Sequence, residues 1–222
     1  MKKAVILLSG CGYYEGTNPW EIAFIISRLE RLGVIAQPTA PEELMYTARD
    51  YTRNPPSETG KRNILAESSR IVRGEVLPIS GLKPESASFL IIPGGLGTVK
   101  HYITDQGSVY PPVARLIRAM FLRGRPIGAI GYGILLAGYT LCKLAPLILA
   151  LPNELEMVSK LEKKGATFVK VNNWEVVYDE ENGVFSTPGI DLSGSIVRGA
   201  HGIETIVDAL AKAKRITRSV QK

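Results

Sequence analysis

Residues that bind metals or form disulfides are scarce in this 222-residue sequence. There are two cysteines, Cys11 and Cys142, and two histidines, His101 and His201. At these spacings they fit neither a zinc site nor a disulfide framework. We therefore expect no metal and no disulfide, and a reducing, cytoplasmic compartment. We also expect no cofactor, because the glycine spacings at 10–16 and 128–133 do not match the Gly-x-Gly-x-x-Gly fingerprint of dinucleotide-binding sites.

The sequence also lacks a long uninterrupted hydrophobic run. The most apolar region, residues 134–151, is interrupted by Lys143 and Pro146, which favours a buried helix followed by an extended segment over a membrane span. The apolar run Ala4–Leu8 is too short for a signal peptide and predicts a first strand. We expect no membrane association.

Excess charge of one sign is confined to the end of the chain. The formal net charge is +6, and five basic residues lie within the last eleven: Lys212, Lys214, Arg215, Arg218 and Lys222. Such a tail is typical of a solvated helix end. A nucleic acid or another anionic partner docking there would give steeply salt-dependent binding. No interleaved aromatic residues or second basic stretch support that alternative, so we do not expect a nucleic-acid partner.

Strands alternate with helices along the whole chain. Ala4–Leu8 predicts a buried strand, Asn18 a helix cap before Pro19, Gly33 the end of that helix, and Val34–Gln37 the next strand. Further strands are predicted at 76–79, 89–92, 126–130, 167–171, 174–178 and 184–187. Further helices are predicted at 61–73, 113–120, 153–164, from near Tyr132 onward, and from Asp191 or Ser193 to Leu210. The order indicates one domain, residues 1–222, with a mostly parallel sheet in a three-layer αβα sandwich.

Residues 41–57 do not fit this alternation. The stretch is polar, contains Asn54, Pro55 and Pro56, and shows no clear period. We expect an excursion from the sheet, or a lid, with at most one short helix.

The stretch Gly124–Gly138 has the pattern of a nucleophile elbow. A short apolar strand, Pro126–Ile130, must turn at Gly131 into a helix that begins near Tyr132, with small residues at Ala129 and Gly133. In such elbows a Ser or Cys sits at the turn, where the following helix N-terminus stabilises its anion. Gly131 has no side chain, so the expected nucleophile is missing.

Several stretches in the right order resemble the ElbB family over nearly the whole chain. They are Ser9–Gly12 with Gly16 and Glu21, Arg62–Glu75, Ile92–Lys100, Gly124–Gly128 and Ser186–Pro188. This family, also called isoprenoid-biosynthesis glyoxalases or enhancing lycopene biosynthesis proteins, belongs to the PfpI-like branch of the class I glutamine-amidotransferase-like superfamily. The resemblance implies a flavodoxin-like sandwich, a homodimer and, in related proteins, conversion of a small 2-oxoaldehyde to a 2-hydroxy acid without glutathione.

The resemblance also implies roles for particular residues. The elbow position is Gly131, where family members generally have Cys, and the carboxylate that would contact an elbow thiol is Glu21. The oxyanion-type amides belong to Gly94, Gly95 and Leu96. The same residues also have plain structural explanations: Glu21 as a helix-capping carboxylate and the glycines as a tight turn.

Other residues near these loops are weaker candidates. Cys11 could replace the nucleophile or be a small buried residue in a turn, and Lys100 and His101 fit surface positions better than a catalytic role. Four aromatic residues could line the cleft or pack ordinarily, with the hydroxyl of the last available where a thiol is missing: Tyr13, Tyr14, Trp20 and Tyr132.

Two main hypotheses follow. In the first, the fold and pocket persist without thiol chemistry, and the protein binds a small carbonyl or carboxylate ligand or serves in assembly. In the second, it is a glyoxalase-type enzyme on small 2-oxoaldehydes that uses Cys11 or Glu21. The absence of a nucleophilic atom at Gly131 favours the first.

Overall fold

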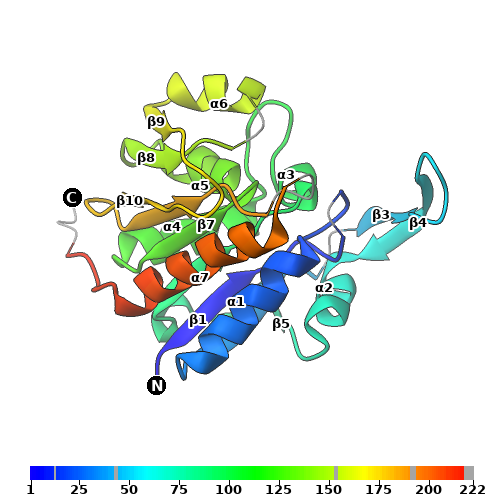
Figure 1. Cartoon of the computed structure of the whole chain (residues 1–222), viewed down its shortest axis with the longest axis horizontal. Helices are drawn as coiled ribbons and strands as arrows, with labels where there is room; N and C mark the ends of the chain where they lie inside the picture. The colour runs from blue at the N-terminus through cyan, green and yellow to red at the C-terminus, as the bar shows by residue number, and fades with distance from the viewer. Residues whose placement is uncertain (13, 43–44, 153–154, 191–193, 218–222) are drawn as a thin grey trace.

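The computed structural model describes residues 1–12, 14–42, 45–152, 155–190 and 194–217 (Figure 1). Its centre is a seven-stranded sheet in the order β10-β11-β7-β6-β1-β2-β5. Neighbouring strands are parallel except for β10 and β11. The strands are β1 (Lys3–Leu7), β2 (Ile35–Ala40), β5 (Leu77–Pro78), β6 (Phe89–Ile92), β7 (Ile127–Ile130), β10 (Val177–Asp179) and β11 (Val184–Thr187).

Helices cover both faces of this sheet. On one face lie α1 (Pro19–Arg31), α2 (Ile64–Val72) and α7 (Ile196–Lys212), and Figure 1 shows α1 and α7 side by side. On the other lie α3 (Leu96–Tyr102), α4 (Pro111–Leu122) and α5 (Gly133–Leu141), and α6 (Leu155–Glu162) packs against α5. This confirms the expected flavodoxin-like three-layer αβα sandwich.

The continuous apolar runs of the central strands follow from this two-sided cover. In β1 and the residue after it, Ala4, Ile6 and Leu8 belong to the core beneath α1 and α7, whereas Val5 and Leu7 belong to the core beneath α4 and α5. Successive side chains of a strand point to opposite faces, so both sets must be apolar.

The first helix begins and ends where the sequence predicts. Asn18 Oδ1 accepts a hydrogen bond from Trp20 N at 3.1 Å, and Pro19 takes the first helical position. The helix ends at Arg31, and Gly33 follows with φ +63°. At its outer side, Arg28 donates two hydrogen bonds of 2.6 Å to Asp208 of α7.

The expectation for residues 41–57 is wrong in its secondary structure. In place of a loop with a short helix, the chain forms an antiparallel hairpin of β3 (Met45–Asp50) and β4 (Ser57–Asn63), which projects from the body (Figure 1). The side chains of Glu58 to Arg62 are exposed, so no alternation of apolar and polar residues marks the strand. The predicted helix 61–73 accordingly begins only at Ile64, where Asn63 Oδ1 accepts from Ala66 N.

Boundaries of other elements also differ. The strand predicted at 174–178 begins at Val177, and the strand at 167–171 is β9 (Ala166–Val169), which pairs with β8 (Leu147–Ala150) outside the main sheet. The last helix is capped by Ser195, whose Oγ accepts from Arg198 N; the predicted caps Asp191 and Ser193 lie outside the described residues.

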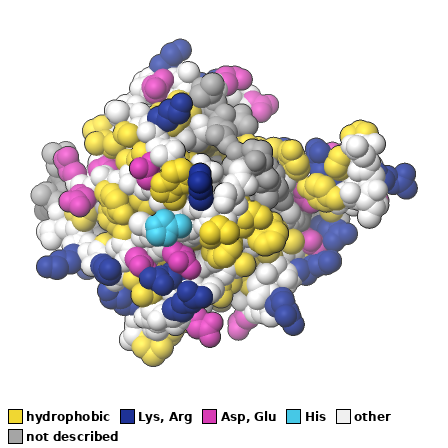
Figure 2. Space-filling view, viewed as in Figure 1, with side chains coloured by type: hydrophobic (Ala, Val, Ile, Leu, Met, Phe, Trp, Pro, Cys, Tyr) yellow, Lys and Arg dark blue, Asp and Glu magenta, His cyan; other side chains and the backbone are white. Residues whose placement is uncertain are grey.

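The described part of the basic tail, up to residue 217, is not simply a solvated helix terminus; Arg218 and Lys222 lie outside the described residues. Helix α7 ends at Lys212, and the following segment binds the turn between α4 and β7: Ile216 N donates to Gly124 O at 2.8 Å and Arg215 Nε to Arg123 O at 2.6 Å. Figure 2 shows positive and negative side chains intermingled over the face formed by α1 and α7. Among the described residues, no helix combines the length and apolar character needed to cross a membrane.

A buried carboxylate joins the β8–β9 pair to the main sheet. Asp179 is 3% exposed; its Oδ2 accepts from Ile148 N at 3.0 Å and its Oδ1 from Asn182 N at 3.1 Å. The Asn182 amide group donates to the same carboxylate and to Pro146 O. The carboxylate thus ties β8 to the β10–β11 turn.

We expect Asp179→Ala to lower the free energy of unfolding by about 2–4 kcal/mol, because buried N–H donors lose their acceptor. Urea unfolding measures the effect. The exposed Glu181 is the matched control, and its alanine variant should stay within about 0.5 kcal/mol of wild type. Equal effects of the two variants would contradict this account of the linkage.

Candidate functional site

The turn after β7 has the backbone of an elbow. Gly131 has φ +52°, its N–H donates to Thr187 O at 3.0 Å, and its carbonyl accepts from Ile134 N at 3.1 Å. Helix α5 begins immediately afterwards at Gly133, with Tyr132 at the capping position. The turn therefore lies at the carboxyl ends of β7 and β11, where parallel sheets bind ligands.

The two glycines of the elbow differ in the space around them. A Cβ on Gly133 would lie 2.2 Å from Ile92 O, so close packing of α5 on β6 excludes any side chain there. A Cβ on Gly131 would have ordinary contacts, 3.4 Å from Pro188 O and 3.6 Å from Glu21 Oε1. The elbow thus retains room for a side chain that the sequence does not supply.

Glu21 is buried in the first turn of α1 beside this position. It is 2% exposed; its Oε2 accepts from Gly94 N at 2.6 Å and its Oε1 from Ile190 N at 3.2 Å. Burial raises the pKa of this carboxyl to about 7, although the backbone hydrogen bonds from Gly94 and Ile190 and that of Asn18 oppose the shift. A group that changes its protonation near neutral pH therefore faces the elbow.

One amide of the glycine turn after β6 already binds this carboxylate. Besides donating to Glu21, Gly94 accepts from Asn18 N at 3.0 Å. Gly95 follows with φ +104°, and a Cβ there would lie 2.2 Å from Gly16 O. The oxyanion role predicted for Gly94, Gly95 and Leu96 therefore depends on the amides of Gly95 and Leu96, because the Gly94 amide already holds Glu21.

Sequence reasoning missed the segment after β11. Gly189 has φ +82°, and a Cβ there would lie 2.6 Å from Glu21 Oε1, while the next residue, Ile190, donates its N–H to the same oxygen. A glycine directly after Ser186–Pro188 at a strand end is the signal that could have shown it.

The surroundings of Cys11 do not favour a thiolate. Its backbone forms a bridge with Thr17, and the pKa of its thiol is raised by burial first and then by Glu67 and Glu15, against the opposing charges of Arg70 and Arg62. A thiol with a raised pKa stays protonated at neutral pH, and the thiolate is the nucleophilic form.

The remaining candidates differ in how far they are buried. Tyr132 is half-buried and packs against the core beneath α4 and α5, whereas Trp20 and Tyr14 are 48% and 43% exposed. His101 Nε2 lies 2.9 Å from Glu15 O, and burial lowers the pKa of its half-buried ring, while Lys100 is exposed. Tyr13 lies outside the described residues. Within the described parts of the chain, no group of three or more His, Cys, Asp or Glu side chains could hold a metal ion.

Sequence comparison relates the chain to amidotransferase-like proteins. A human protein named glutamine amidotransferase-like class 1 domain-containing protein 3, mitochondrial, is 33% identical over 153 residues, which is 67% of this chain and 53% of that protein. The zebrafish ES1 protein, mitochondrial, is 28% identical over 206 residues, covering 82% of this chain and 74% of the relative. The chain spans about half the length of the human relative. No family model matches the sequence.

Solved structures share the fold. An isoprenoid biosynthesis protein with an amidotransferase-like domain from Ehrlichia chaffeensis superposes with a TM-score of 0.87 at 24% identity, over 95% of this chain and 98% of that one. Drosophila melanogaster DJ-1beta superposes with a TM-score of 0.55 at 17% identity, over 96% and 91% of the two chains. The chain belongs to the class I glutamine amidotransferase-like proteins.

In this amidotransferase-like chain the two elbow glycines should respond differently to alanine. We expect Gly131→Ala to lower the free energy of unfolding by about 1 kcal/mol, the strain of a left-handed residue. Gly133→Ala should cost about 3 kcal/mol, because its Cβ would collide with the Ile92 carbonyl. Chemical denaturation of the pair measures the difference, and equal losses would show that the elbow lacks the space described.

Glu21 should make stability depend on pH in an unusual direction. Its pKa of about 7 in the fold exceeds the ordinary 4.5, so between these values the folded protein holds a proton that the unfolded chain releases. Its contribution to stability is therefore present at low pH and is lost as the pH rises towards 7. Between pH 5 and pH 8 we expect wild type to lose about 2–3 kcal/mol relative to Glu21→Gln.

Urea unfolding of both proteins at each pH gives this double difference. Gln also disturbs the Gly94 and Ile190 contacts, but that cost does not titrate and cancels between the two pH values. A difference that stays constant from pH 5 to pH 8 would show that the Glu21 carboxyl is ionised throughout.

Proposed function

We propose that the elbow site binds a small carbonyl or carboxylate compound without forming a covalent bond to it. The observation that carries this proposal is the buried Glu21 carboxyl beside Gly131, where a Cβ would have room but no nucleophilic atom exists. Covalent catalysis at an elbow requires a Ser or Cys. The preserved frame without that atom is suited to binding.

The donors around the site indicate how such a compound would be held. In its protonated form the Glu21 carboxyl can donate a hydrogen bond to a carbonyl or carboxylate oxygen, and its pKa of about 7 makes this form abundant at neutral pH. The N–H groups of the Gly95–Leu96 turn are candidates for a second contact to the same oxygen.

A second candidate function is a glyoxalase-type reaction that uses Glu21 as a general base. The overall reaction adds one water to a 2-oxoaldehyde and gives a 2-hydroxy acid. Glu21 favours this alternative because a carboxyl with a pKa of about 7 can take up and return a proton at neutral pH. The raised pKa of Cys11 gives no such support to a migrated thiol nucleophile.

Loss of glyoxal and methylglyoxal separates the two functions. We expect wild-type protein to match the buffer and heat-killed blanks, and Gly131→Cys to gain turnover because it places a thiol beside Glu21 at the start of α5. Gly131→Ala is the matched control that fills the same space without a nucleophile, and it should remain inactive.

Two results would overturn the binding proposal. Turnover by wild type that Glu21→Gln abolishes would establish general-base catalysis, and turnover that Cys11→Ser abolishes would establish a migrated nucleophile.

Pyruvate, which has both a carbonyl and a carboxylate, is the binding probe. It should shift the backbone amide resonances of Gly95 and Leu96 in wild type, and less so in Glu21→Gln.

A further inference from the structure

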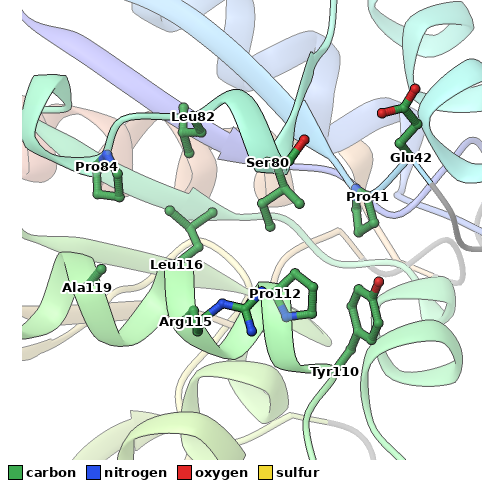
Figure 3. Close-up of a pocket in the computed structure, with 11 residues that line it drawn as sticks. Pro41, Glu42, Ser80, Leu82, Pro84, Tyr110, Pro112, Arg115, Leu116 and Ala119 are labelled. Carbon is green, nitrogen blue, oxygen red and sulfur yellow. The ribbon is translucent and has the colours of Figure 1, made fainter.

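A cavity of about 470 Å³ lies apart from the elbow, between α4 and the segment that joins β5 to β6 (Figure 3). Its volume is within the range of small-molecule sites. One wall is a single face of α4. Its lining residues Arg115, Leu116 and Ala119 follow Pro112 by three, four and seven positions, which places all four on one side of the helix. The opposite wall is the segment from Ile79 to Pro84, which contains one short 3₁₀ turn and the start of a second.

The cavity has an apolar end and a polar end. Figure 3 shows Leu82, Pro84, Leu116 and Ala119 at one end. At the other end lie Ser80, Tyr110 and the exposed Glu42, whose carboxylate Figure 3 shows directed away from Arg115 and Tyr110. The shape and lining therefore suit an elongated ligand with one apolar and one polar end.

Arg115 lies where the two ends meet. Figure 3 shows its side chain extending along α4 towards Pro112. Within the described ranges no carboxylate forms an ion pair with Arg115, whereas Arg28 and Arg62 each pair with a carboxylate. A guanidinium beside an apolar groove is a planar donor set for an anionic oxygen pair.

The rest of the polar end disfavours a doubly charged anion more than a singly charged one. The exposed Glu42 carboxylate points away from Arg115, but its charge at this end repels a dianionic phosphate more than a carboxylate. The first two residues of α4, Pro111 and Pro112, have no N–H groups, so this helix start lacks two of the donors on which phosphate sites depend.

We propose that this cavity binds an aliphatic monocarboxylic acid, with its carboxylate on Arg115 and its tail between Leu82 and Leu116. From Arg115 to Ala119 the helix rises about 6 Å, which matches a tail of roughly five or six carbons. The site does not share residues with the elbow, so it stands independently of the function proposed there.

Titration of the ¹⁵N-labelled full chain with acetate, butyrate, hexanoate and octanoate tests the proposal. Amide resonances of residues 79–84 and 112–119 should shift, and affinity should rise about fourfold for each added methylene until the apolar end is full. Arg115→Ala should weaken hexanoate binding at least tenfold, and Arg115→Lys should restore part of it.

One control variant, one further variant and a second ligand test the two ends of the cavity. Arg118 lies on the same helix, is exposed and does not line the cavity, so Arg118→Ala should bind hexanoate as wild type does. Ala119→Phe should fill the apolar end and weaken octanoate more than acetate. Hexyl phosphate should bind more weakly than hexanoate, because Pro111 and Pro112 leave the start of α4 without two N–H donors and the charge of Glu42 opposes a dianion.

Three outcomes would overturn the proposal. The first is the absence of amide shifts at residues 79–84 and 112–119 with every acid at concentrations up to about 10 mM, which exceeds the weakest dissociation constant that we expect. The second is an equal loss of hexanoate affinity in Arg115→Ala and Arg118→Ala. The third is tighter binding of hexyl phosphate than of hexanoate. Thermal unfolding of each variant shows whether it is folded, and these exposed or half-buried positions should leave the unfolding temperature unchanged within a few degrees.

Discussion

The buried carboxyl of Glu21 connects three parts of the chain that are far apart in sequence. It belongs to α1, and its two oxygens accept backbone hydrogen bonds from Gly94 after β6 and from Ile190 after β11. These loops meet only because their strands are parallel and end at one edge of the sheet. Since burial disfavours the ionised form, the carboxyl binds its proton more tightly than a free side chain while it still joins the three loops.

The glycines of the site are explained by this carboxyl and by the close approach of the loops around it. Added Cβ atoms at Gly94 and Gly189 would lie 3.0 Å and 2.6 Å from Glu21 oxygens, and one at Gly95 would meet the backbone of Gly16. Gly131 is different, because its surroundings leave space for a side chain. Packing therefore accounts for the neighbouring glycines but does not require one at the elbow.

The sequence predicts the fold well because the central strands are buried on both faces and the helices carry clear caps. Asn18 and Gly33 bound α1 as expected, and the apolar runs of β1, β6 and β7 mark the centre of the sheet. The hairpin of β3 and β4 was not predictable in this way. It projects into solvent, where no buried face imposes an alternating pattern on its residues.

In the candidate site, too, the order of motifs predicts where the residues lie but not which contacts they make. Motif order places Glu21, Gly94 and Gly131 at one edge, and their positions agree with that expectation. Three features of the site depend instead on distances and burial between loops, which the spacing of residues along the sequence does not determine. They are the hydrogen bond from the Gly94 amide to Glu21, the close approach of Gly189 to the same carboxylate, and the raised pKa of the Cys11 thiol.

The absence of a side chain at Gly131 changes what the carboxyl beside it can do. With a thiol at the elbow, the proton on Glu21 and the charge on sulfur would be coupled, because two negative charges in one buried site are unfavourable. With glycine there, the protonation of Glu21 is set by burial and by the Gly94 and Ile190 amides. In the binding function proposed above, this proton would be shared with an oxygen of the ligand, and the frame that would support a nucleophile would act as a neutral hydrogen-bond donor below about pH 7.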